Sequence, residues 1–295
     1  MSERRLHQID VFAPAAYAGN PLAVVLDADG LDADTMQRFT DWTNLSEVTF
    51  LLPPTDPEAD YRVRIFCPGR ELPFAGHPTL GTCHAWLEAG GVPRGEHIVQ
   101  ECGAGRVRIR REPTATGTRL AFAAPPRRRS GPLDDDDVAR LVRGLGIART
   151  DVLDHAWCDN GPNWRAVLLG SAEQVLSLVP DPSVLGALDV GVVAPHRRGG
   201  RSGSGWGLAG SPADVDFEVR AFFPGRCGLA EDPVTGSLQA AVAAWLIGAG
   251  HAPSRYVARQ GTRLGRDGRV YIAQQGDDIW VGGDSITCIR GIVRL

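Results

Sequence analysis

Eight residues of this chain, Val-Arg-Ile-Phe-Cys-Pro-Gly-Arg at 63–70, return about half a chain length later as Val-Arg-Ala-Phe-Phe-Pro-Gly-Arg at 219–226. After each copy comes a polar residue followed by proline, His77 in the first case and Asp232 in the second. Each copy then continues into a segment of small residues that contains a Trp-Leu pair. Two copies of one unit predict two similar domains. The different polar residues predict an asymmetric site between two helix starts.

The length and composition agree with two domains of an ordinary soluble protein. The 295 residues are 43% hydrophobic and 22% charged, and each half is long enough to bury a core of its own. The formal net charge is −4 at pH 7, which favours neither nucleic acid nor an anionic membrane surface as a partner. We therefore expect a small-molecule partner, with no nucleic acid and no membrane.

A proline- and arginine-rich stretch at 123–132 predicts the linker between the halves. We expect an N-terminal domain of residues 1–124 and a C-terminal domain of residues 125–295, with the boundary inside 123–133. The closing strand of the chain is free to cross back to the first domain.

The six cysteines form no metal or dithiol motif. None belongs to a Cys-x-x-Cys pair, and the chain has no apolar leader and no apolar run that could span a bilayer. These features predict a cytoplasmic protein whose cysteines are reduced and mostly buried. The cysteines are Cys67, Cys83, Cys102, Cys158, Cys227 and Cys288.

Short apolar and alternating runs bounded by Gly, Pro, Asn and Asp predict a strand-rich chain. Four segments have the pattern of helices, at 32–42, 78–89, 136–145 and 233–248. In each half one of these segments is apolar and rich in small residues, so we expect a curved sheet around a central helix. Strands are expected at 6–12, 22–26, 48–52, 62–66, 106–110, 164–169, 190–194, 215–223, 270–273, 279–282 and 286–294.

The segment 198–211 is rich in Gly and Ser and is expected to be a mobile loop. Its Gly-Ser-Gly cluster is not a dinucleotide-binding fingerprint, because no strong strand precedes it and no helix follows at the required place.

The two predicted helix starts are candidate anion sites. The first N–H groups of a helix have no partner inside it and the dipole favours negative charge, so two starts can hold a substrate carboxylate. Gly76 leaves the backbone open beside His77, which is not a preferred capping residue. Gly236 and Ser237 follow Asp232 in the first predicted turn. The simpler alternative for Asp232 is that it caps its helix and does nothing more.

Glu47 stands where an apolar strand run begins, at Val48. A carboxylate at the edge of a buried strand is partly desolvated, which favours its protonated form and suits it to proton transfer. The alternative is an ordinary exposed glutamate at the start of a strand. Asn20, which precedes Pro21, likewise has a simple alternative as a turn residue.

Four motifs, in order along nearly the whole chain, together resemble the PhzF family. That family is named after a phenazine-biosynthesis isomerase and shares the diaminopimelate epimerase fold. Val48 departs from the family pattern, in which a threonine is common at this position. The motifs are Gly-Asn-Pro-Leu-Ala-Val at 19–24, Asn-Leu-Ser-Glu at 44–47, Glu-Leu-Pro-Phe-Ala-Gly-His-Pro-Thr-Leu-Gly at 71–81 and Glu-Asp-Pro-Val-Thr-Gly-Ser at 231–237.

The resemblance implies an α/β (α+β) fold of two pseudo-symmetric halves, each a barrel-like β-sheet around a central helix, with the site in the cleft between them. In the family, the glutamate that matches Glu47 is the acid/base that moves a proton. The residues that match His77 and Asp232 assist it. The resemblance also implies a homodimer that uses no cofactor and no metal.

The resemblance further implies a binding site for the carboxylate of a small substrate. The matching residues bind it largely through backbone N–H groups, and Asn20 belongs to the same substrate-binding set. The residues that match the carboxylate-binding positions are Gly76, His77, Gly236 and Ser237.

Diaminopimelate epimerase and its racemase relatives use two cysteines, one on each face of the α-carbon. Here the two motif positions hold His77 and Asp232, and the nearest cysteines are Cys83 and Cys227. We therefore expect an isomerase with one base, in which Glu47 takes a proton from one carbon and returns it to another. The alternatives are an epimerase or racemase that returns the proton to the same carbon, and a small-molecule-binding protein without turnover.

Overall fold

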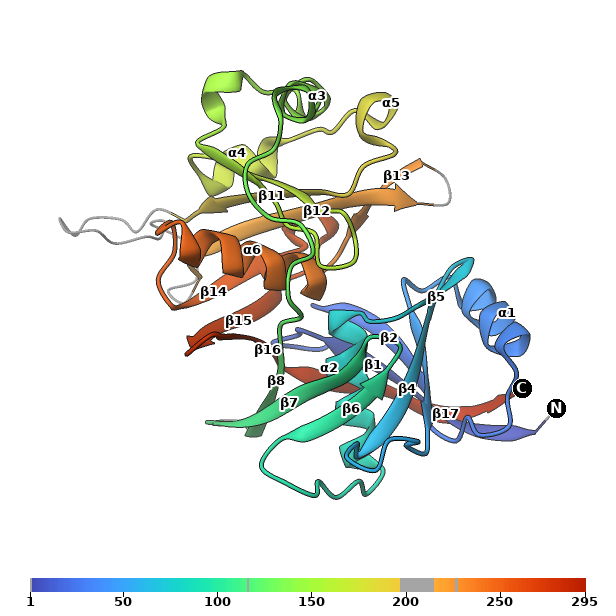
Figure 1. The fold of residues 1–295 in the computed structure, drawn as a ribbon. Helices are drawn as coiled ribbons and strands as arrows, with labels where there is room; N and C mark the ends of the chain where they lie inside the picture. Colours follow the sequence, from blue (N-terminus) through green and yellow to red (C-terminus); the bar gives the residue numbers. More distant parts are fainter. Residues whose placement is uncertain (1, 116, 197–214, 226–227) are drawn as a thin grey trace. The chain divides into compact units, whose positions relative to one another are not determined.

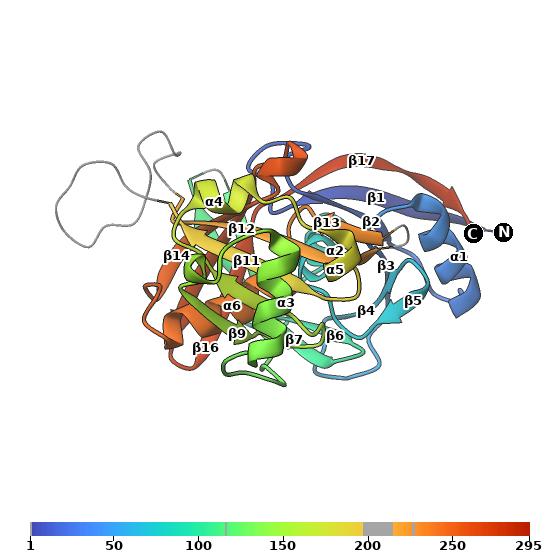
Figure 2. The same cartoon turned by 90° about the horizontal axis from the view of Figure 1, so that it is seen from above.

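The computed structural model describes residues 2–115, 117–196, 215–225 and 228–295, and the chain divides into two compact units (Figure 1). Unit 1 comprises Met1–Ala123 and Gly282–Leu295, and unit 2 comprises Ala124–Val281. The C-terminal segment belongs to unit 1 because β17 (Ser285–Arg294) pairs antiparallel with β1 (Glu3–Val11) along its length. Figure 2 shows these two strands side by side.

In the part of unit 1 that the structure describes there are two helices and nine strands. Helix α1 (Ala33–Thr43) begins after Asp32, whose carboxylate accepts a hydrogen bond from Thr35 N and caps the helix. Helix α2 (Gly76–Glu88) lies against β1, β2, β3 and β8. The strands besides β1 and β17 are β2 (Asn20–Val25), β3 (Val48–Leu52), β4 (Tyr61–Cys67), β5 (Arg70–Leu72), β6 (Ile98–Cys102), β7 (Gly105–Thr114) and β8 (Gly117–Ala123).

Among its described residues, unit 2 contains four α-helices and eight strands. Two short 3-10 helices, Arg149–Asp151 and Thr262–Leu264, also occur in it. The α-helices are α3 (Asp135–Leu145), α4 (Ala172–Ser177), α5 (Pro182–Leu185) and α6 (Gly236–Gly248). The strands are β9 (Asp154–Trp157), β10 (Arg165–Leu168), β11 (Val190–Pro195), β12 (Phe217–Gly225), β13 (Gly228–Asp232), β14 (Arg255–Gln260), β15 (Gly268–Gln275) and β16 (Asp278–Gly283).

The two units repeat one order of strand pairing. In unit 1, β2 runs parallel to β3, β3 is antiparallel to β4, and β4 is parallel to β6. In unit 2, β10, β11, β12 and β14 pair in the same directions. The repeated eight-residue segment begins on β4 in one unit and on β12 in the other. The mixed α/β class predicted from the sequence is confirmed.

The helices α2 and α6 are buried around most of their circumference, as expected for segments of small and apolar residues. Gly81 allows α2 to approach the sheet closely. A Cβ atom at Gly81 would lie 2.6 Å from Leu22 Cδ2 and 2.9 Å from Val11 Cγ2, which is closer than side chains pack. The absence of a side chain at this position therefore sets how near α2 lies to β1 and β2.

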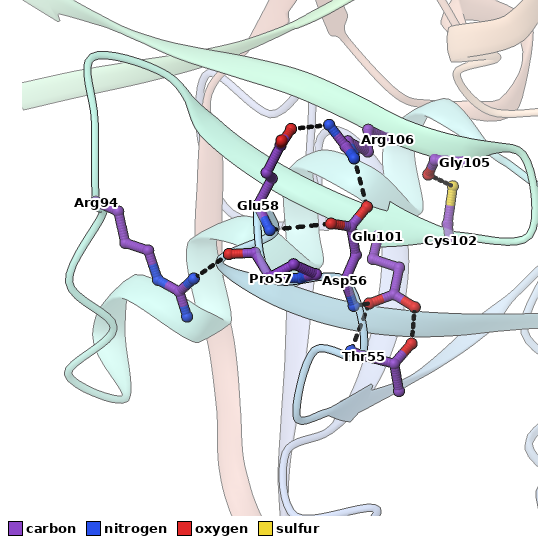
Figure 3. A network of polar contacts seen from close by, with 9 residues as sticks. All are labelled: Thr55, Asp56, Pro57, Glu58, Arg94, Glu101, Cys102, Gly105 and Arg106. Carbon is purple, nitrogen blue, oxygen red and sulfur yellow. Dashed lines mark hydrogen bonds and ion pairs between the residues drawn. The ribbon is translucent and has the colours of Figure 1, made fainter.

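A polar network holds the connection between β3 and β4 against the β6–β7 hairpin (Figure 3). The Glu101 carboxylate accepts hydrogen bonds from Thr55 N at 2.7 Å, from Asp56 N at 2.9 Å and from the Thr55 hydroxyl. Arg106 Nε donates to Asp56 Oδ2, and its guanidinium also pairs with Glu58. Because Arg106 is half-exposed, we assign this network to loop positioning and expect each pair to add less than about 1 kcal/mol.

No helix in the described part of the chain is long and apolar enough to cross a membrane.

Candidate functional site

The start of α2 holds the histidine predicted from the sequence. The helix begins at Gly76, two residues earlier than Pro78, so His77 is its second residue. The capping position is Ala75, which supplies no side-chain hydrogen bond to the first turn. His77 is 4% exposed, and this burial lowers its pKa to about 3. The imidazole is therefore neutral at neutral pH.

Three of the predicted residues meet in unit 1. His77 Nε2 lies 3.4 Å from Glu47 Oε2, and His77 Nδ1 lies 3.3 Å from Asn20 Nδ2. The Asn20 amide donates to Nδ1 in this orientation, so the ring proton belongs on Nε2, the nitrogen that faces Glu47. The Glu47 side chain is 18% exposed, and its Oε2 atom is buried.

Two parallel strands bring these residues together. Asn20 opens β2, and Glu47 immediately precedes β3, which pairs with β2 in parallel. Asp10, a buried residue that the sequence analysis missed, accepts a hydrogen bond at 3.0 Å from Gly19 N, next to Asn20. An acidic residue inside an otherwise inward-facing strand pattern was the available signal for it.

A chain of buried side chains fixes the residue before the helix. Thr79 Oγ1 donates to Ala75 O at 2.9 Å, Gln100 Nε2 donates to Thr79 Oγ1 at 3.0 Å, and Tyr61 OH donates to Gln100 Oε1 at 3.1 Å. Each of these groups is satisfied by the next, so the start of α2 is held by β4 and β6.

The start of α6 in unit 2 is built from other residues. The helix begins at Gly236, and Ser237 is its second residue. Asp232 is the last residue of β13, and its Oδ2 accepts a hydrogen bond of 2.6 Å from the hydroxyl of Thr235, the capping residue. Gln260 Nε2 donates to Thr235 Oγ1 at 2.9 Å and to Asp232 O at 3.0 Å.

The structure corrects the predicted equivalence of His77 and Asp232. Both central helices have 13 residues and begin with glycine, so Gly76 matches Gly236 and His77 matches Ser237. The position of Asp232, four residues before its helix at the end of a strand, is that of Leu72 in unit 1. The prediction that this helix begins at Pro233 is wrong, because Pro233 lies in the connection between β13 and α6, and the helix begins at Gly236.

Of the two cysteines nearest to these helices, Cys83 lies within the described residues and Cys227 does not. Cys83 is fully buried inside α2, and burial raises the pKa of its thiol to about 12, so it is not a thiolate at neutral pH. Cys227 and the Gly/Ser-rich segment 198–211 lie outside the described residues.

Lowering the pH is expected to destabilise unit 1 through His77. Its pKa falls from 6.5 to about 3 on folding, so between these values only the unfolded chain binds this proton. The free energy of unfolding should therefore fall as the pH drops from 6.5 toward 3, by about 1.4 kcal/mol per pH unit from this group. Urea unfolding of the wild type and of His77→Gln from about pH 4 to pH 8 measures the difference.

At pH 8 the histidine is neutral in both states, so the comparison there gives the cost of the substitution itself. The His77→Gln variant should lose stability less steeply than the wild type on the acid side. Equal slopes in the two proteins would contradict a buried neutral His77.

Comparisons with known proteins agree over nearly the whole chain. The family model for phenazine biosynthesis-like proteins (PhzC-PhzF) matches residues 9–291. Antisense-enhancing sequence 1 of Schizosaccharomyces pombe is 34% identical, with 99% of each chain covered. The trans-2,3-dihydro-3-hydroxyanthranilate isomerase of Pseudomonas fluorescens is 31% identical, covering 97% of this chain and 98% of that protein.

Solved structures share the fold. The crystal structure of a Bacillus anthracis phenazine biosynthesis protein of the PhzF family aligns with a TM-score of 0.80, covering 100% of both chains at 23% identity. A probable proline racemase from Agrobacterium radiobacter aligns with a TM-score of 0.59 at 15% identity, covering 99% of this chain and 92% of that chain. The epimerase-like fold predicted from the sequence is confirmed.

Proposed function

This chain belongs to the phenazine biosynthesis-like protein family (PhzC-PhzF), a family of isomerases, and we propose that it moves a proton within a small carboxylate-bearing substrate without a cofactor. The observation that carries the proposal is the contact of Glu47 with a buried, neutral histidine that Asn20 orients. Glu47 is the group that takes the proton from one carbon and returns it to another.

The neutral state of His77 suits this role. A protonated imidazole would hold the Glu47 carboxylate as an ion pair and weaken it as a base. A neutral imidazole whose Nε2–H faces Oε2 orients the carboxylate and leaves its charge available. His77 thus acts as an orienting group in the proposal, and Asn20 fixes its tautomer.

The start of α6 supplies the carboxylate site in the proposal. The first-turn N–H groups at Gly236 and Ser237 have no acceptor within the helix, and the positive end of the helix dipole lies there. The proposal assigns the same kind of contact to Gly76 at the start of α2. Asp232 assists from the end of β13, where its carboxylate holds the Thr235 hydroxyl.

The residues at the helix starts favour one base over two thiols. The sequences there are Ala-Gly-His at 75–77 and Thr-Gly-Ser at 235–237, and neither contains cysteine. A racemase that works with one thiol on each face of the substrate would need cysteines at these positions. The proposed reaction therefore shifts the proton between two carbons on one face of the substrate.

The first substrate to test is trans-2,3-dihydro-3-hydroxyanthranilate, because relatives from Pseudomonas are named as isomerases of this compound. Incubation with the enzyme in D2O, followed by proton NMR, should show a moved double bond and deuterium at a single carbon. Deuterium at the original carbon with inverted configuration would indicate an epimerase instead. Absence of conversion and of exchange, with this and related amino- and hydroxy-carboxylates, would overturn the proposal.

A second candidate is a small-molecule-binding role without turnover. The relative from Schizosaccharomyces pombe, at 34% identity, has a name that describes no enzyme. Binding of the same carboxylates with no isotope exchange would favour this role.

A further inference from the structure

One loop of unit 2 contacts the start of α6 through two side chains. The loop connects β9 to β10, and it contains Asn160 and Trp164. Asn160 Nδ2 donates to Ser237 O at 2.9 Å, and Trp164 Nε1 donates to Ser237 Oγ at 3.1 Å. Both side chains are buried, with 8% and 3% of the residue exposed.

The Asn160 amide has an acceptor that nothing in the described residues satisfies. Because a backbone carbonyl only accepts hydrogen bonds, the contact with Ser237 O fixes which end of the amide is the NH2 group. The oxygen Oδ1 is then buried beside the first turn of α6 and has no hydrogen-bond partner in the described part of the protein. A buried acceptor without a donor destabilises the unbound protein, and a bound ligand with a donor group would remove this cost.

Trp164 sets the direction of the Ser237 hydroxyl. An indole N–H can only donate, so Ser237 Oγ accepts from Trp164 and its own hydrogen points elsewhere. That hydrogen is available to a ligand oxygen at the helix start, together with the first-turn N–H groups. The first turn of α6 thus offers donors for an anion, and the side chain that contacts Ser237 O carries one buried acceptor, Asn160 Oδ1.

The loop is held firmly in this position. Cys158 N donates to Trp164 O at 2.8 Å, and Gly161 N donates to Asp159 Oδ1 at 2.9 Å. Trp157, at the end of β9, has the guanidinium carbons of Arg129 and Arg165 at 3.5 and 4.3 Å from its ring centre. A loop fixed in this way can place two side chains on the helix start without the entropy cost of ordering them on binding.

We propose that Asn160 is a specificity residue that recognises an N–H or O–H donor next to the substrate carboxylate, and that Trp164 is a positioning residue for Ser237. This inference rests on the proposed function, in which the start of α6 binds the carboxylate. The substrate class that satisfies every group is an amino- or hydroxy-carboxylate. A carboxylate without such a donor leaves Asn160 Oδ1 unsatisfied and is rejected.

The test compares two ligands of one shape, 2-aminobenzoate and benzoate, by calorimetric titration of the full chain. The wild type should bind 2-aminobenzoate tenfold or more tightly than benzoate. Asn160→Leu, which keeps the size of the side chain, should abolish this preference. Asn163→Leu is the matched control, because Asn163 is exposed on the same loop, and it should keep the preference.

Trp164→Phe should weaken the binding of both ligands by about three- to tenfold and keep their ratio, since it removes one N–H donor from Ser237. In a Ser237→Ala background the Trp164→Phe change should not weaken ligand binding further. If Trp164 only supported the fold, its replacement would weaken binding in this background as well. Thermal unfolding of every variant separates loss of the fold from loss of binding.

Equal binding of the two ligands by the wild type, or no binding of 2-aminobenzoate, would overturn the inference. So would an unchanged preference in Asn160→Leu. Isotope exchange without this discrimination would refute the role of Asn160 and leave the proposed isomerase intact. Discrimination without any exchange would refute the isomerase and leave the binding role of the loop.

Discussion

Replacing Glu47 by Gln is expected to lower kcat by about 10²–10⁴-fold, the range found when a positioned acid/base is removed. Glutamine has nearly the same shape and can still face His77 across the 3.4 Å contact, so the helix start should keep its geometry. It cannot accept a proton from carbon, and so it removes only the proposed chemistry. Rates of product formation and of deuterium exchange, measured with whichever carboxylate the wild type converts in the D2O assay, check the expectation.

The duplicated fold supplies a control for this substitution. Asp189 immediately precedes β11, which pairs in parallel with β10, as Glu47 immediately precedes β3, which pairs with β2. Asp189→Asn therefore removes a strand-start carboxylate at the corresponding place in unit 2 and should leave the rate within about twofold. If Glu47→Gln also exchanges deuterium at the wild-type rate, Glu47 is only a strand-start residue and is not the base.

The parts of the candidate site that the sequence predicted are those that local patterns specify. Local patterns singled out Glu47, which stands where a buried strand begins, and His77, which follows a glycine near a helix start, but their roles came from the resemblance to the PhzF family. Both helix starts differ from the prediction, which rests on the preference of proline for the first helical position. Proline also fits later in the first turn, as at Pro78, or in the connection before it, as at Pro233.

Other parts of the site depend on contacts between distant residues. Asn160 and Trp164 reach Ser237 only because the β9–β10 loop passes over the first turn of α6, and no local pattern indicates this. A weak signal existed in the sequence, since Gly-Asn-Pro at 19–21 leads into β2, which begins at Asn20, and Gly-Pro-Asn at 161–163 lies shortly before β10. In each unit the residues around this turn contact the second residue of the central helix.

The second large effect is expected at Arg220, where Arg220→Met should lower the free energy of unfolding by about 3–5 kcal/mol. The Arg220 side chain is 5% exposed and binds both oxygens of Glu231, at 2.9 and 2.8 Å. Its Nη1 also donates to Val175 O at 3.1 Å and to Leu178 O at 2.8 Å. Methionine fills similar space but leaves a largely buried carboxylate and two carbonyls without this donor.

The first copy of the repeat supplies the matched control. Arg64 also binds both oxygens of a glutamate, Glu71, at 2.8 and 2.7 Å. Those two side chains are 29% and 42% exposed, so water can replace the guanidinium, and Arg64→Met should cost less than about 1 kcal/mol. Urea unfolding of both variants compares the same chemical change at a buried and an exposed site. Equal costs would contradict burial as the cause.

A double substitution separates the ion pair from the carbonyl contacts. If the unpaired carboxylate of Glu231 dominates the loss in Arg220→Met, then Arg220→Met with Glu231→Leu should regain most of it, because replacing both members of a buried pair by apolar groups is often nearly neutral. If Val175 O and Leu178 O dominate, the double variant should be as unstable as Arg220→Met. We expect recovery, because an unpaired buried charge costs more than an unsatisfied carbonyl.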